Sequence, residues 1–242
     1  GGLSLYTIFF RSKTIMAFLS DNSIKIRGKL GDKIYKELNG KIYVSKAPVK
    51  INYPKDSAAV QRRERFAITQ KLNGAVRKLP PLAYLWKHFC RPREVYGKLF
   101  QDIFHRLNNT SVNDVRLFPI FNLTIEVTDF NYLDGKLLFT ISPLNKFGGV
   151  WSPLEVQINV HGVILSYNDE PEIKNKFRVI PFSGIDQRTV TDAPLSFQSE
   201  LSPVQQDMIA ASQSTVILFT FITSNQKGIP EKNSATFFET IK

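Results

Sequence analysis

The stretch FNLTIEVTDFNYLDGKLLFTI (Phe121–Ile141) decides the fold class of this chain. From Phe121 to Val127 every second residue is apolar and its neighbours are polar, which is the period of a half-buried β-strand. Asp134-Gly135 supplies the two residues of a type I′ turn, and a second alternating run, Leu137 to Ile141, follows it. The stretch therefore predicts antiparallel β-structure.

The same pattern continues toward the C-terminus. Leu154 to Val160 alternates with polar residues up to His161, and further strands are expected at Phe177 to Ile180, Val216 to Ile222 and Ala235 to Ile241. Ser202 to Ala210 is typical of a short helix on a crossover. With no helices between most of these strands, the pattern predicts an antiparallel β-sandwich of roughly seven strands, immunoglobulin-like in type.

A β-hairpin is predicted upstream of the sandwich. Asn39-Gly40 has the two residues that a type I′ turn requires, and the resulting register places Tyr35 opposite Val44 and Glu37 opposite Ile42.

Three helices are predicted between the hairpin and the sandwich. The first begins at Asp56 or Ser57 and ends near Leu79. Pro80-Pro81 ends it and begins a second helix that extends to Cys90, and a third follows Pro92. One face of the first helix carries residues at three- and four-residue spacing, which are Phe66, Thr69, Leu72, Val76 and Leu79.

These elements suggest an α+β fold, mainly β, in three parts: an extension (1–27), a hairpin with a basic helical layer (28–108) and the sandwich (109–242).

The net charge changes sign at the boundary after residue 108. Residues 1–108 hold 22 lysines and arginines against 7 acidic residues, whereas residues 109–242 hold 10 against 14. This asymmetry favours an anionic partner such as nucleic acid, or a neighbouring copy bound head to tail; a solvated basic face is the third interpretation.

The N-terminal octet from Leu3 to Phe10 is apolar and β-prone. It lacks the charged n-region of a secretory signal, and it is too short to span a bilayer. We interpret it as a possible docking strand that contacts another subunit, although Met16 could equally be the native start. The expected contact residues are Leu3, Leu5, Tyr6, Ile8, Phe9 and Phe10.

No arrangement of side chains points to catalysis. His88, His105 and His161 are scattered, without a second ligand at metal spacing. Cys90 has no histidine or acid paired with it by motif, and the acidic run 169–172 reads as a solvated loop. We therefore expect no catalytic residues, no cofactor and no metal site, and interpret the chain as a non-enzyme.

The helical region contains a dense set of cations that could meet an anionic partner, and Tyr84 and Trp86 could stack on bases, although both also suit packing of a helix on a sheet. The cations are Arg62, Arg63, Arg65, Lys71, Arg77, Lys78, Lys87, Arg91 and Arg93.

The run from Gly28 to Pro48, with its Gly-x-x-Gly, hairpin and Ser-x-x-Pro pattern, and the Gln61-Arg-Arg-Glu-Arg-Phe66 helix that follows resemble the opening of an uncharacterised Bacteroidetes family. The resemblance covers about residues 28 to 90 and implies a β-rich remainder. It implies no activity.

The function that we predict from these observations is a non-catalytic structural subunit that assembles into a homo-oligomer or polymer, such as a filament, tube or shell, by strand addition and head-to-tail charge pairing. An extracellular filament or virion-like assembly is favoured over a plain cytoplasmic location, with no membrane span. The first alternative is a phage-like or other nucleic-acid-associated protein. The second is a surface- or carbohydrate-binding sandwich, which rests on architecture alone.

Overall fold

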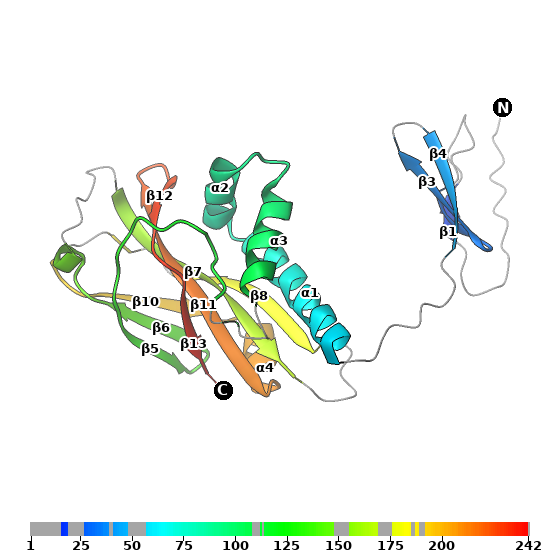
Figure 1. The fold of residues 1–242 in the computed structure, drawn as a ribbon. Coiled ribbons are helices and arrows are strands. Elements are labelled where there is room, and N and C mark those ends of the chain that lie inside the picture. Colours follow the sequence, from blue (N-terminus) through cyan, green and yellow to red (C-terminus); the bar gives the residue numbers. More distant parts are fainter. Residues whose placement is uncertain are drawn as a thin grey trace, which may run out of the picture. The chain divides into compact units, whose positions relative to one another are not determined.

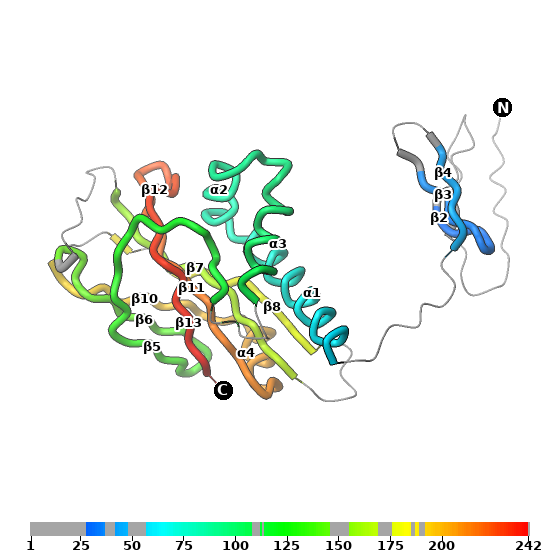
Figure 2. Tube along the Cα trace, in the orientation of Figure 1, coloured from blue at the N-terminus to red at the C-terminus, as the bar shows by residue number. Residues whose placement is uncertain are grey.

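The computed structural model describes residues 16–18, 27–38, 41–47, 57–107, 112, 114–147, 155–168, 176–184, 187–188 and 192–241. The chain divides into two compact units, residues 1–55 and 56–242 (Figures 1 and 2). The sequence predicted boundaries after residues 27 and 108. The observed boundary differs because the helices share a hydrophobic core with the large sheet of the second unit, and so belong to it.

The first unit contains one antiparallel sheet, which we call the N-terminal sheet. Its strands lie in the order β1 (Met16–Phe18), β2 (Arg27–Leu30), β3 (Lys33–Leu38) and β4 (Lys41–Lys46). The predicted hairpin register is confirmed, since Tyr35 pairs with Val44 and Glu37 pairs with Ile42. The expected turn residues, 39 and 40, lie outside the described part of the chain.

A three-stranded antiparallel sheet, the small sheet, begins the sandwich of the second unit. Its order is β10 (Leu195–Glu200), β6 (Lys136–Ile141) and β5 (Val127–Leu133). The predicted turn joins β5 to β6, with φ of 50° at Asp134 and 74° at Gly135, as a type I′ turn requires. The expected strand from Phe121 to Val127 is mostly absent: Leu123 makes a single bridge to Ser234, and the ladder begins at Val127.

The large sheet of the second unit has two long central strands, β7 (Glu155–Tyr167) and β11 (Ser214–Asn225). Next to β7 lie β8 (Phe177–Ser183) and β9 (Gln187–Arg188). Next to β11 lie β12 (Pro230–Asn233) and β13 (Phe237–Thr240). Short helices complete the connections: the 3₁₀ turn η1 (Leu144–Phe147) and α4 (Pro203–Ala210), which begins where the sequence predicted a crossover helix.

Three longer helices cover the outer face of the large sheet (Figure 1). They are α1 (Ser57–Val76), α2 (Pro80–Phe89) and α3 (Val95–Arg106), close to their predicted bounds. Thr69, Leu72 and Val76 are buried as expected, but Phe66 is 48% exposed. Phe66 lies at the edge between α1 and α3 and packs on Phe100 instead of the sheet.

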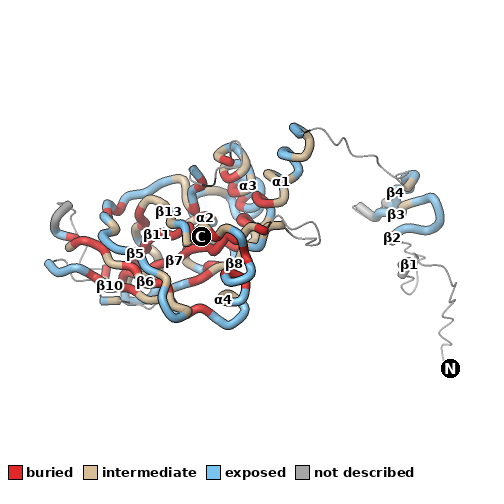
Figure 3. Tube along the Cα trace, turned by 90° about the horizontal axis from the view of Figure 1, so that it is seen from below, coloured by how far each residue is buried: buried red, intermediate tan, exposed pale blue. Residues whose placement is uncertain are grey.

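The second unit therefore has three layers, with the large sheet in the middle (Figures 1 and 3). One core fills the space between the two sheets and contains Phe139, Phe197 and Phe219. The other lies between the helices and the large sheet, where Leu72 and Trp86 meet Val163 and Leu218. Neighbouring positions of β7 and β11 point into different cores, which is why both strands are buried on two sides. The mainly-β α+β class is confirmed.

None of the described helices combines the length and apolar character that crossing a membrane requires.

Candidate interaction surfaces

The predicted cations lie on α1, on α2 and in the turns that follow these helices. Between residues 57 and 107 the chain holds eleven lysines and arginines against three acidic residues, so this layer is strongly basic. Seven of the nine predicted cations are exposed. These are Arg62, Arg63, Arg77, Lys78, Lys87, Arg91 and Arg93.

The other two predicted cations have structural roles. Arg65 donates hydrogen bonds to the Phe104 carbonyl, and its guanidinium lies 4.1 Å from the centre of the Phe104 ring. Lys71 donates to the Phe177 carbonyl and so ties α1 to the edge of the large sheet. Burial, and next the nearby Arg178, lowers the pKa of Lys71. Neither side chain is fully free for a partner.

Aromatic rings form a stripe along the outer side of the α1–α3 contact, which we call the aromatic stripe. Phe66 packs edge-on against Phe100 at 5.2 Å, and Phe100 stacks on Phe104 at 5.7 Å and on Tyr96 at 6.4 Å between ring centres. Arg77 lies over Tyr96 at 5.4 Å. Phe66 and Tyr96 are nearly half exposed. The sequence did not predict this stripe, because helical spacing placed Phe66 on the same face as the buried Leu72 and Val76.

The two aromatics proposed for base stacking are not on this stripe. Trp86 is buried, and its Nε1 donates to the Leu117 carbonyl at 2.9 Å. Its ring packs edge-on against Phe89 and Phe118. Tyr84 is half-buried and lies against His88, with 4.0 Å between ring centres. Trp86 therefore has no face available to a base, as its alternative interpretation as a packing residue anticipated.

The small sheet and α4 carry charge of the opposite sign. Residues 127–141 and 192–210, which we call the acidic region, hold five acidic residues against Lys136 alone, and Lys136 pairs with Glu200 at 3.2 Å. The outer face of the small sheet has a shallow depression between Asp129, Leu138 and Gln198. The large sheet separates this region from the helices (Figure 1). The five acids are Asp129, Asp134, Asp192, Glu200 and Asp207.

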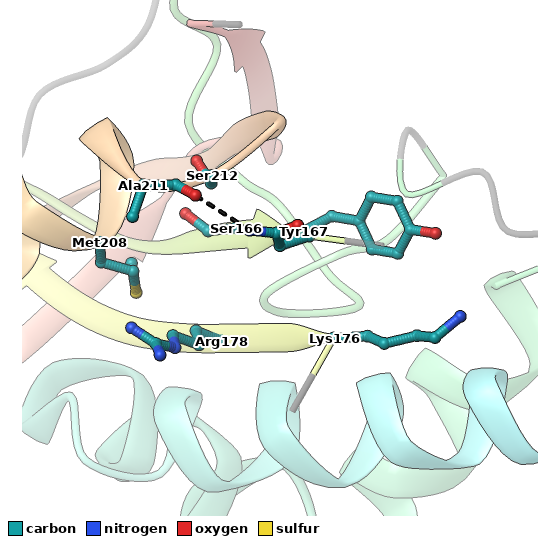
Figure 4. Close-up of a pocket in the computed structure, with 8 residues that line it drawn as sticks. Ser166, Tyr167, Lys176, Arg178, Met208, Ala211 and Ser212 are labelled. Carbon is teal, nitrogen blue, oxygen red and sulfur yellow. Dashed lines mark hydrogen bonds between the residues drawn. The ribbon is translucent and has the colours of Figure 1, made fainter. Parts of the chain in front are cut away.

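A small pocket lies at the end of β7, between β8 and α4 (Figure 4). Arg178 points toward Met208 there, whereas Lys176 extends away and pairs with Glu64 at 3.4 Å. The hydroxyl of Thr215 lies 3.1 Å from Ser166 Oγ and 2.6 Å from Ser212 Oγ, so the buried hydroxyls satisfy one another. The Asn168 amide donates to the Ala211 carbonyl at 3.0 Å. This network closes one end of the sandwich.

The candidate catalytic side chains do not converge on one another. His161 is buried on the helix-facing side of β7, where its Nδ1 is 2.9 Å from Ser183 Oγ. Burial lowers its pKa to about 4, so the ring is neutral at pH 7. Burial, followed by Glu94, raises the pKa of the Cys90 thiol, which disfavours the reactive thiolate. Within the described ranges, no three His, Cys, Asp or Glu residues are grouped as a metal site would require.

The predicted docking residues from Leu3 to Phe10 lie outside the described part of the chain. No protein-family model matches this chain, and no curated protein matches it.

Proposed function

We propose that this chain is a non-catalytic structural subunit that assembles head to tail with copies of itself. One observation supports this function above the others: the basic helices and the acidic region lie on opposite sides of the large sheet. A copy therefore presents a positive face in one direction and a negative face in the other. Contacts between two different faces join copies head to tail, which generates a closed ring or an open filament.

The expected assembly is sensitive to salt, because the proposed contact is made by exposed charges. Light scattering and sedimentation at low and high salt would measure it. We expect large particles at low salt and smaller ones at high salt. A wild-type chain that stays monomeric at low salt over a wide concentration range would overturn the proposal.

Charge reversal tests which faces meet. We expect R62E/R77E in the helical layer, and D192K/D207K in the acidic region, each to abolish assembly. Mixing the two variants restores complementary faces and should restore it. The control is Lys227→Glu, an exposed residue of the turn between β11 and β12 that belongs to neither face. Normal assembly of both double variants would exclude the charge contact.

The strand-addition part of the function remains a proposal as well. In it, Leu3 to Phe10 of one copy docks on another copy, and deletion of residues 1–15 should leave a folded chain that assembles less. A deletion variant that assembles like the full chain would exclude these residues as the contact.

A nucleic-acid-associated function is the second candidate, and the aromatic stripe is the observation that favours it. Phe66 and Tyr96 are nearly half exposed, Arg77 lies over Tyr96, and Arg62 is one helical turn before Phe66 on α1. Single-stranded nucleic acid binds to such combinations of stacking and charge. Fluorescence anisotropy of a labelled single-stranded oligonucleotide would test it. Binding should weaken steeply with salt and should weaken further in F66A/Y96A. Absence of binding at low salt would exclude this candidate.

We also propose that the sandwich is immunoglobulin-like in topology. The order β5-β6-β10 corresponds to strands A-B-E of that fold, and β8-β7-β11-β13 corresponds to C′-C-F-G. Such a topology is compatible with a binding or structural role, and does not by itself imply either.

A further inference from the structure

Among the residues whose burial the structure describes, the N-terminal sheet has no buried side chain. Residues 28–36 and 42–47, whose burial the structure describes, are all half-buried or exposed (Figure 3). The register places Leu30, Tyr35, Ile42 and Val44 on one face, where three of them are between 43% and 54% exposed. A sheet this small needs a second surface to be stable in water. From the described residues alone, we infer that its stability depends on an additional contact.

An open strand edge of the second unit could pair with the N-terminal sheet of another copy. The available edges differ in length, in proline content and in whether they already have a partner. Pro181 lies within β8, where it removes a backbone donor. The edge strand β10 already bonds across to β8, since Ser199 Oγ donates to the Ser183 carbonyl. β12 and β13 have only four residues each. The remaining edge, β5, has seven residues, no proline and a partner strand on one side only within the described residues.

The N-terminal sheet offers a matching edge. Its outer strands are β1, with three residues, and β4, with six residues and no proline. Lys41 and Lys46, the ends of β4, are five positions apart, as are Asp129 and Asp134 on β5 and its turn. An antiparallel register can therefore place both lysine positions opposite the aspartates.

This register also matches the faces of the two sheets. Val44 then lies opposite Asn131, and Ile42 lies opposite Leu133, both on the outer face of the small sheet. The apolar positions Ile42 and Val44 would continue across Leu133, which is 54% exposed. Pairing of β4 with another β4 would be opposed, because it brings lysines together.

We propose that β4 of one copy adds to the β5 edge of a second copy, antiparallel, so that the N-terminal sheet and the small sheet form one continuous sheet. The inference rests on the proposed self-assembly and names one contact within it. The partner is therefore a second copy of this chain, and the contact uses main-chain hydrogen bonds with Lys46 opposite Asp129.

Disulfide trapping between two different variants tests this contact. Cys90→Ser provides the background, since serine can still donate to the Trp86 carbonyl that Cys90 contacts. Val44→Cys chains are mixed with Asn131→Cys chains under oxidising conditions. We expect the heterodimer to form about tenfold faster than with Leu133→Cys, which keeps Asp129 but lies two positions out of register and therefore beyond the usual disulfide distance. Equal rates for the two pairs would overturn the register.

Charge reversal provides a second measurement. We expect Lys46→Glu to slow trapping and Asp129→Lys in the partner chain to restore it. If light scattering shows assembly but no trapping occurs, the β4–β5 contact is wrong and the proposed function stands. If the wild-type chain is monomeric, both are wrong. A V44C/N131C chain that closes its disulfide within single monomers would show that β4 binds its own β5 and would overturn the exchange between copies.

Discussion

At the scale of single residues, His161 is a buried imidazole whose Nε2 has no hydrogen-bond partner among the residues that the structure describes. Sequence alternation placed it on the polar face of a strand, but α1 to α3 cover that face. The strand pattern identified β7 correctly and could not reveal the cover, because a two-sided environment depends on segments far away in the sequence. Phe66 shows the opposite error, since helical spacing alone cannot tell the core from the edge of a helix pair.

His161 makes stability depend on pH. Its folded pKa of about 4 lies below the ordinary 6.5, so the unfolded chain binds more protons between these values. The neutral buried ring contributes about 3 kcal/mol to the free energy of unfolding. This stabilisation is fully present above pH 6.5 and is lost as the pH decreases toward 4. Denaturant unfolding of wild type and His161→Gln over this range would measure it. The variant should show a shallower pH dependence, and identical slopes would contradict the prediction.

Gly162 occupies a position where β7 approaches β11 too closely for a side chain. A Cβ there would lie 2.3 Å from the Leu218 carbonyl oxygen and 2.6 Å from the Phe182 ring. We expect Gly162→Ala to lower the free energy of unfolding by about 1–3 kcal/mol. Gly74→Ala is the matched control, because a Cβ on that helical residue meets nothing within 4 Å, and it should stabilise by about 0.5–1 kcal/mol. Urea unfolding of both variants would measure these changes, and an equal change in the two would contradict the close approach at Gly162.

At the scale of elements, turn residues and prolines correctly predicted the hairpin registers and helix ends that depend on neighbouring residues. Both hairpin registers follow from two-residue turns, and α2 begins at the expected Pro80-Pro81. The strand β10 was not predicted, because its inward side carries Leu195, Phe197 and Ser199 and so has only two apolar residues. Ser199 is buried nonetheless, since its hydroxyl bonds to the Ser183 carbonyl. The partners that make such a strand possible come from elsewhere in the chain.

The start of α4 is fixed by a capping box. Ser202 Oγ accepts from the Gln205 amide, and the Gln205 side chain accepts from the Ser202 amide at 2.8 Å. Because α4 buries Met208 and Ile209 in the core between the sheets, fraying here would loosen the sandwich. We expect Ser202→Ala to destabilise the chain by about 1 kcal/mol. Val204→Ala, on the exposed side of the same turn, should change stability by less than about 0.5 kcal/mol. Equal effects in chemical denaturation would argue against the cap.

At the scale of the whole molecule, the charge asymmetry acquires a direction only through the fold. The sequence shows that basic and acidic residues are separated along the chain, and adjacent segments usually lie side by side. Here the chain passes from α3 to β5 around the large sheet, whose two central strands come later in the sequence. The basic helices and the small sheet therefore lie on opposite sides of the large sheet. The order of the segments along the chain does not by itself place the large sheet between them. The position of the acidic region opposite the basic helices was therefore not predictable without that layer order.

The two-unit division predicts that the second unit folds without the first. Every buried residue of both hydrophobic cores lies between 68 and 222, so within the described part of the chain removing residues 1–55 deletes no core contact. We expect the shortened chain to unfold cooperatively, with a free energy within about 1 kcal/mol of the full chain under conditions that keep both monomeric. Removing residues 1–79 is the contrasting control. It takes away α1 and exposes Val163 and Leu165 to water, so cooperative unfolding should be lost.

Near-ultraviolet circular dichroism during thermal unfolding distinguishes cooperative from non-cooperative unfolding in the two shortened chains. A 56–242 chain without cooperative unfolding would contradict the prediction and would mean that the N-terminal sheet stabilises the sandwich directly.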